Sequence, residues 1–313
     1  MKNFFRFLVS QLSFFYKNKK INKKYETKVI KEITKFYQKK ISNNNKLKTH
    51  VMFNNYIKKL IIEKKFSNFL RENIIQKIFF VHNRIYILFM LFKIIFNKNK
   101  LYKKLLLEDN IGNPIRYFLY PKSSGNRIRE VFHLLNFQNF SKISLNRIKT
   151  ILEFGGGYGN MARLFYKINK NINYKIFDTF HVNLLQYYYL RMLKIPSTFN
   201  ELKNKNISLN YKISKYNSFS KTDKKLFIAN WSLSESPLKL RKIIFNKIIN
   251  FDYILISYQE KFENINNHLY FSYIAKNFNH KKFIVRLFQI PFMNFLRLSN
   301  NNYYLFVKKI RLS

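Results

Sequence analysis

Four of the six glycines of this chain fall in one short window, where bare backbone could approach a bound molecule. The segment Ile151-Leu-Glu-Phe154 before them reads as a short apolar strand, and Asn160 to Ile168 after them reads as a helix. Glycine lets a chain reverse tightly, and the N-terminus of a helix presents free N–H groups. The window therefore predicts a ligand-binding turn between a strand and a helix, built from Gly155, Gly156, Gly157 and Gly159.

Two acidic residues accompany this turn, in a chain that has only 15 acids. Glu153 lies at the end of the first strand, and Asp178 lies just past a second apolar strand, Tyr174 to Phe177. An acid after the second strand, about 20 residues beyond the glycines, is placed to accept hydrogen bonds from ribose hydroxyls. Both acids are therefore predicted to bind a cofactor.

The spacing of the motif separates two classes of cofactor. A nicotinamide site has the pattern G-x-G-x-x-G, with two residues before the last glycine. Here the pattern is Glu153-x-Gly155-x-Gly157-x-Gly159, which resembles motif I of the class I methyltransferases. That resemblance implies S-adenosylmethionine as the cofactor, with Tyr158 and Asn230 among its binding residues. A glycine turn with a purely structural role is the competing interpretation.

The wider sequence is similar to the family of sugar O-methyltransferases, over roughly residues 108–308. The similarity is carried by 152–159, 162–164, 176–178 and 185–191, and by the shorter stretches 111–114, 126–129, 232–235, 258–259 and 266–267. Phe177-Asp178-Thr179 departs from the Asp-Leu-Pro expected there. The resemblance implies a sugar hydroxyl as acceptor, in surface polysaccharide or glycan synthesis, with substrate contacts from Asn113, Arg129, Glu130, Gln259 and Asn266. For Arg129, ion pairing on a helix surface is the alternative.

Methyl transfer to an alcohol requires a base, because the pKa of the hydroxyl lies far above neutrality. The fourth predicted strand ends at Ala229, and ligands of open α/β sheets sit beyond the carboxyl ends of the strands. Glu235 is therefore the first candidate base, with capping of the helix that opens near Pro237 as the alternative. His181 is the second candidate, and a surface or packing role is its alternative.

Strand–helix alternation from residue 151 onward predicts the fold. The expected strands are 151–154, 174–177, 207–213, 226–229, 253–257, 283–287 and 304–307, and the expected helices are 160–168, 182–193 and 237–249. This order predicts an α/β, doubly wound Rossmann-like sheet, which the resemblance makes a methyltransferase sheet. Three regions are expected: a basic, mainly helical region 1–107, a connector on the substrate side at 108–150 with a helix at 128–137, and the cofactor-binding domain 151–313.

The formal net charge of +44 has two competing explanations, a polyanionic partner and the composition bias of an AT-rich genome. Residues 1–107 hold 26 of the 59 Lys and Arg but only four acids. The chain has no cysteine, and neither a cleavable signal nor an apolar run long enough to span a bilayer is visible. We expect a cytoplasmic protein, for which peripheral contact with an anionic membrane is a further possibility. We expect neither a nucleic-acid partner nor a bound metal.

Two other functions compete with a sugar O-methyltransferase. The charge suggests a nucleic-acid methyltransferase, but Asn230-Trp-Ser-Leu stands after the fourth strand in place of an Asn-Pro-Pro-Tyr-type tetrapeptide. A non-catalytic protein that binds S-adenosylmethionine is the third possibility. The intact acid–glycine motif and Asp178 argue against it, since a decayed site has no need of them.

Overall fold

The computed structural model describes residues 21–41, 51–79, 85–201, 206–212, 224–293 and 301–310. The chain groups into two compact units. The first unit comprises Met1–Phe132, Gly157–Arg163 and Phe180–Ser197, and the second comprises His133–Gly156, Leu164–Thr179 and Thr198–Ser313. These two units do not begin and end at residues 107 and 150, where the sequence predicts domain boundaries. The predicted domain boundaries stay a prediction.

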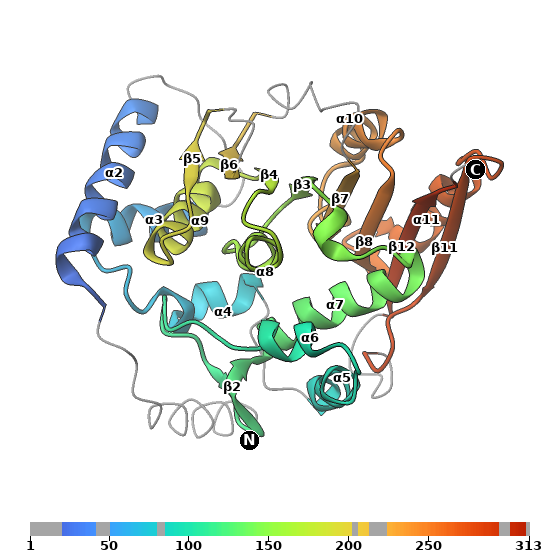
Figure 1. Cartoon of the computed structure of the whole chain (residues 1–313). Helices are drawn as coiled ribbons and strands as arrows, with labels where there is room; N and C mark the ends of the chain where they lie inside the picture. The colour runs from blue at the N-terminus through green and yellow to red at the C-terminus, as the bar shows by residue number, and fades with distance from the viewer. Residues whose placement is uncertain are drawn as a thin grey trace. The chain divides into compact units, whose positions relative to one another are not determined.

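The second unit is built on a large sheet whose described strands run in the order β11-β12-β8-β7-β3-β4-β6-β5 (Figure 1). In chain order they are β3 (Thr150–Phe154), β4 (Asn173–Phe177), β5 (Ser197–Phe199), β6 (Asn206–Asn210), β7 (Lys225–Asn230), β8 (Tyr253–Gln259), β11 (Phe283–Gln289) and β12 (Asn302–Lys309). Pairing is parallel from β6 through β4, β3 and β7 to β8. β12 runs antiparallel to both of its neighbours, β8 and β11.

Both faces of this sheet are covered, because the residues of its strands are apolar on both sides. All five residues of β3 are buried. On one face, α10 (Leu238–Ile248) and α11 (Asn267–Lys276) bury a cluster that includes Leu305 and Val307. On the other face, Phe137 packs edge to face on Phe306. The predicted doubly wound α/β fold is therefore confirmed.

The order of the strands reverses at β3. From β3 the chain proceeds to β4 on one side, and it later returns to β7 on the other side. In open α/β sheets such a reversal opens a crevice beyond the carboxyl ends of the strands, and ligands bind there. Gly155 and Gly156, with which the glycine turn begins, follow β3 directly, so the structure places these two residues at this point of the sheet.

The described part of the first unit is mainly helical. Its elements are α2 (Lys23–Ile41), α3 (Val51–Glu63), η2 (Phe69–Arg71), α4 (Asn73–Phe79), α5 (Ile85–Ile95), α6 (Lys100–Leu105), the hairpin β1 (Arg116–Tyr117) and β2 (Tyr120–Ser124), and α9 (Phe180–Met192). α2 packs on α9, where Phe36 meets the ring of Tyr187 edge to face at 5.2 Å. Helices α7 (Gly125–Ser141) and α8 (Asn160–Ile168) contribute residues to both units.

Several predicted elements differ in extent. The helix expected at 128–137 is the longer α7, and the strand expected at 207–213 is β6, with Ile213 outside the described residues. The 3-10 turn η3 (Leu145–Arg147), strand β5 and the hairpin β9 (Lys261–Phe262) and β10 (Ile265–Asn266) were too short to leave a periodic pattern. No helix in the described part of the chain is long and apolar enough to cross a membrane.

Candidate functional site

The glycine turn begins against the segment that follows β7. Gly155 has φ +71°, in the left-handed region that favours glycine, and its N–H donates to the carbonyl of Phe177 at 2.8 Å. A Cβ at Gly155 would lie 2.2 Å from Cβ of Ser232, whose hydroxyl donates to the carbonyl of Phe154. Only glycine therefore fits at this position while the two segments remain in contact.

Glu153 lies close to the next glycine. A Cβ on Gly156 would approach Oε2 of Glu153 at 2.9 Å and the side chain of Ile176 equally closely. The carboxylate is buried and accepts a hydrogen bond from the hydroxyl of Tyr174 at 2.8 Å. These contacts tie Glu153 to the turn and to the neighbouring strand, and its direct contact with a cofactor stays a prediction.

The remaining motif residues belong to the first unit. Gly157 and Gly159 have φ +54° and +95°, and the buried amide of Gln186 donates to the carbonyl of Gly157 at 2.9 Å. The ring of Tyr158 is buried and packs edge to face on Tyr189 with centroids 5.0 Å apart. Tyr158 is therefore a packing residue by its side chain, and only its backbone remains available to a ligand.

Asp178 is joined by a residue that sequence reasoning missed. The backbone N–H of Asp178 donates to the carbonyl of Asn210 at 3.2 Å, because Phe177 and Asn210 are paired at the ends of β4 and β6. Asn210 is fully buried, and its Nδ2 has no hydrogen-bond partner among the described residues. A buried donor without an acceptor costs about 1–3 kcal/mol, a cost that an acceptor on a bound molecule removes.

The ends of β7 and β8 are also linked by polar groups. Asn230 Oδ1 accepts a hydrogen bond from the hydroxyl of Ser257 at 2.9 Å. Trp231, the only tryptophan of the chain, follows with φ +63°, which is rare for a bulky residue. Its N–H donates to the carbonyl of Ser257 at 2.7 Å, and its indole Nε1 donates to Asn302 at 3.2 Å. Backbone strain held in place by such bonds is typical of functional sites.

Glu235 and Gln259 meet in the second unit. Gln259 Nε2 donates to Glu235 Oε1 at 3.2 Å, and Gln259 Oε1 accepts from the hydroxyl of Ser234 at 3.1 Å. Glu235 is an exposed residue, yet the surrounding protein partly desolvates its carboxyl group, and this raises the pKa of Glu235. The hydrogen bond from Gln259 has the opposite, smaller effect and lowers the pKa. α10 begins after Pro237 without a side-chain cap, so helix capping does not account for Glu235.

Arg241, which sequence reasoning missed, holds the segment that carries Glu235. Its guanidinium is fully buried and donates to the carbonyls of Ser234 and Ser236 at 2.6 and 2.8 Å, and to Asn267 Oδ1 at 2.8 Å. These three hydrogen bonds fix the planar guanidinium of Arg241, which thereby joins the segment after β7 to the start of α11. The available signal was an arginine on the buried face of a helix, three residues before Ile244.

The second candidate base, His181, lies among aromatic rings of the first unit. Its ring centroid is 6.1 Å from that of Tyr37 and 5.3 Å from that of Phe180. These contacts favour the packing alternative for His181. Its role in catalysis stays a prediction.

The predicted substrate residues are divided between the units. Asn113 (φ +53°) bonds to Asn68, and Arg129 pairs with Asn126 and, at 3.8 Å, with Glu130 itself; all of these lie in the first unit. Asn266 lies in the second unit, where it caps α11 by accepting from the N–H of Leu269 at 3.0 Å. Each of these side chains has a structural partner, and their contact with a substrate stays a prediction.

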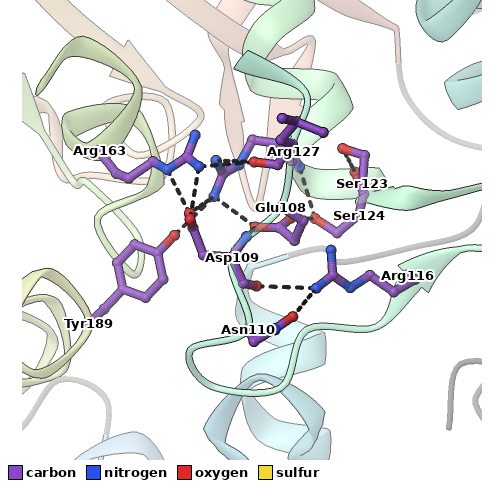
Figure 2. A network of polar contacts seen from close by, with 10 residues as sticks. Glu108, Asp109, Asn110, Arg116, Ser123, Ser124, Arg127, Arg163 and Tyr189 are labelled. Carbon is purple, nitrogen blue, oxygen red and sulfur yellow. Dashed lines mark hydrogen bonds and ion pairs between the residues drawn. The ribbon is translucent and has the colours of Figure 1, made fainter. Parts of the chain in front are cut away.

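A buried ion-pair network, defined by Glu108, Asp109, Arg127 and Arg163, holds the start of α8 within the first unit (Figure 2). Arg127 Nη2 lies 2.7 Å from Glu108 Oε1, and both side chains are almost completely buried. Arg163, four residues after Gly159, bonds Asp109 through Nε at 2.6 Å and through Nη2 at 2.9 Å. Burial alone would lower the pKa of Arg127, but the neighbouring Glu108 raises it.

The hydroxyl groups of Tyr187, Tyr188 and Tyr189 also form hydrogen bonds with charged side chains of the first unit. Their hydroxyls bond to Glu32, Glu26 and Arg127 at 2.8, 2.6 and 2.9 Å. All three rings are buried, so they serve packing within the first unit. Within the described residues no group of three or more His, Asp and Glu side chains is arranged to hold a metal ion.

Neither a protein-family model nor a curated protein matches the sequence. Among solved structures, the chain is similar to an rRNA methylase from Streptococcus thermophilus, with 12% identity, a TM-score of 0.41, and coverage of 56% of this chain and 95% of that one. It is also similar to an O-methyltransferase family protein from Burkholderia thailandensis, with 12% identity, a TM-score of 0.38 and 60% of each chain covered. For mitomycin 7-O-methyltransferase the identity is 11%, the TM-score 0.36, and the coverage 59% of this chain and 58% of that one.

Proposed function

We propose that this protein is an S-adenosylmethionine-dependent methyltransferase that methylates a hydroxyl group of a sugar. The observation that carries the proposal is the pairing of Asp178 with Asn210 beside the turn that Gly155 opens. Asp178, which would accept hydrogen bonds from ribose hydroxyls, follows β4, and Asn210, a buried amide with an unpaired Nδ2, ends the adjacent strand β6.

These residues fit a nucleoside cofactor. Asp178 would accept hydrogen bonds from the ribose, and Asn210 would donate to an acceptor on the bound nucleoside. Gly155 and Gly156 let the turn pack closely against Ser232 and Glu153, which would hold the turn beside these residues. S-adenosylmethionine supplies an activated methyl group on a sulfonium, so the protein mainly aligns donor and acceptor. The E-x-G-x-G-x-G spacing supports this cofactor over a nicotinamide.

Glu235 would receive the proton of the acceptor hydroxyl. Its raised pKa makes the carboxylate a stronger base than an ordinary glutamate, and Gln259 orients one of its oxygens. Arg241 positions the same segment without reaching the reacting atoms. The choice of a sugar rests on the family resemblance of the sequence.

Cofactor binding is the first test. Calorimetric titration with S-adenosylmethionine should give a dissociation constant of roughly micromolar size, and Asp178→Ala should weaken binding by about 10- to 100-fold. Asp252→Ala is the matched control: it removes an aspartate at the opposite, amino-terminal edge of the sheet, where Asp252 accepts from the N–H of Lys225. Absence of binding by the folded parent protein would refute the proposal.

The pH dependence of turnover tests Glu235. A base works only when ionised, so turnover should fall as the pH drops through a pKa above the ordinary glutamic acid value. Glu235→Gln should lower kcat by about 10²- to 10⁴-fold and remove this acid limb, with cofactor affinity unchanged. Glu263→Gln, in the exposed turn between β9 and β10, should leave the profile as it is. An unaltered limb in Glu235→Gln would exclude Glu235 as the base.

A nucleic-acid methyltransferase is the second candidate, favoured by the net charge of +44. Transfer of labelled methyl groups to RNA or DNA, and not to sugar nucleotides or glycans, would establish it. Cofactor binding without transfer to any of these acceptors would favour a non-catalytic protein of the same fold.

A further inference from the structure

We propose that the junction of α5 and α6 in the first unit docks the protein on an anionic membrane surface. We define the docking elbow as the exposed apolar residues Ile85, Phe92 and Phe96 together with the exposed lysines Lys93, Lys98, Lys100, Lys103 and Lys104. This inference is independent of the proposed methyl transfer.

α5 is apolar on two faces. Ile87, Met90, Leu91 and Ile94 point into the core, as expected for a packed helix. Ile85, Phe92 and Phe96 recur at helical spacing on the outer face, where they are 53%, 45% and 80% exposed. Single exposed apolar residues are ordinary, but a line of large ones along one helix marks a surface that contacts something apolar.

The charge around this line identifies the partner. All five lysines of the elbow are exposed, and no acidic residue occurs between Glu72 and Glu108. Lysines beside bulky apolar side chains suit the boundary of a bilayer, where the rings enter the acyl region and the ammonium groups meet anionic headgroups. A protein partner of acidic surface would also attract the lysines, but it would not require three large apolar side chains in line.

The turn between the two helices is well defined. Asn97 Oδ1 accepts from the N–H of Asn99, and Asn99 caps α6 by accepting from the N–H of Leu101, each at 2.9 Å. Tyr102 and Leu105 anchor α6 in the core and leave its lysines outside. The elbow is therefore presented by packed helices, which keeps the entropy cost of binding low.

The test must separate the elbow from the large overall charge. Co-sedimentation of the full chain with vesicles of phosphatidylcholine containing roughly 30% phosphatidylglycerol should show binding that weakens with salt. Phe92→Gln/Phe96→Gln should reduce partitioning by about tenfold or more, because two rings no longer leave water. The matched control is Leu269→Gln/Tyr273→Gln, an equally spaced exposed pair on α11, and it should change partitioning by less than about twofold.

Two charge-reversal variants, each with two lysines replaced by glutamate, complete the test. Lys100→Glu/Lys104→Glu should weaken binding much more than Lys31→Glu/Lys35→Glu, which makes the same change of net charge on the exposed face of α2. Equal effects of the two lysine pairs would show diffuse attraction and overturn the proposal. So would unchanged partitioning of the phenylalanine variant, or a vesicle-free dimer that this variant dissociates, since the elbow would then contact a second copy of the chain.

Discussion

Replacing Arg127 with alanine is expected to lower the free energy of unfolding by about 3–5 kcal/mol. The substitution leaves the carboxylate of Glu108, whose side chain is 1% exposed, without its guanidinium partner at 2.7 Å. It also removes the donor to the hydroxyl of Tyr189. An unpaired charge in a buried site costs much more than the pair contributes, so the loss should be large. Urea denaturation of parent and variant, with an unchanged slope, measures it.

Two further variants show whether burial is the cause. Arg191→Ala breaks a looser pair with Glu32, 3.8 Å long and about a quarter exposed, and should cost less than about 1 kcal/mol. Glu108→Gln combined with Arg127→Met removes both charges and should recover much of the stability lost in Arg127→Ala. A loss below about 1 kcal/mol in Arg127→Ala would mean that water reaches and solvates the carboxylate of Glu108.

Replacing Gly155 with valine is expected to weaken S-adenosylmethionine binding by about 100-fold or more. Two penalties add at this residue: a left-handed φ of +71°, and a Cβ that would lie 2.2 Å from that of Ser232. The turn must move away from the segment after β7, and the proposed cofactor contacts move with it. Calorimetric titration measures the loss.

A second substitution that partly restores binding would identify the steric part of this loss of affinity. Gly155→Ala should bind more weakly than the parent, and adding Ser232→Gly should restore part of the affinity by removing the Cβ that Gly155→Ala meets. Gly112→Val is the matched control in the first unit, since Gly112 has φ +76° and a Cβ added to it would lie 2.3 Å from the ring of Phe69. It should reduce stability without reducing cofactor affinity in the molecules that remain folded. Parent-like binding by Gly155→Val would mean that the cofactor does not lie at this turn.

The sequence by itself determined the elements that carry the motif. Glycines are scarce here, so four of them between an apolar strand and a helix leave few alternatives, and β3, α8 and β4 lie where the pattern predicts them. Alternation of strand and helix is a local property of the chain, and it was sufficient for the doubly wound fold. Asp178 could be singled out from the sequence because its position follows from the end of β4.

Only the tertiary structure decided which residues meet. Asn210 joins Asp178 because β6 pairs with β4, and Gln259 reaches Glu235 because β8 pairs with β7 and brings together residues 24 positions apart. The antiparallel insertion of β12 and the buried bonds of Arg127, Arg163 and Arg241 likewise join distant segments. Periodicity reports which face of an element is apolar, but it carries no information on the neighbour that covers that face. For that physical reason the contacts around the glycine turn emerged only from the folded chain.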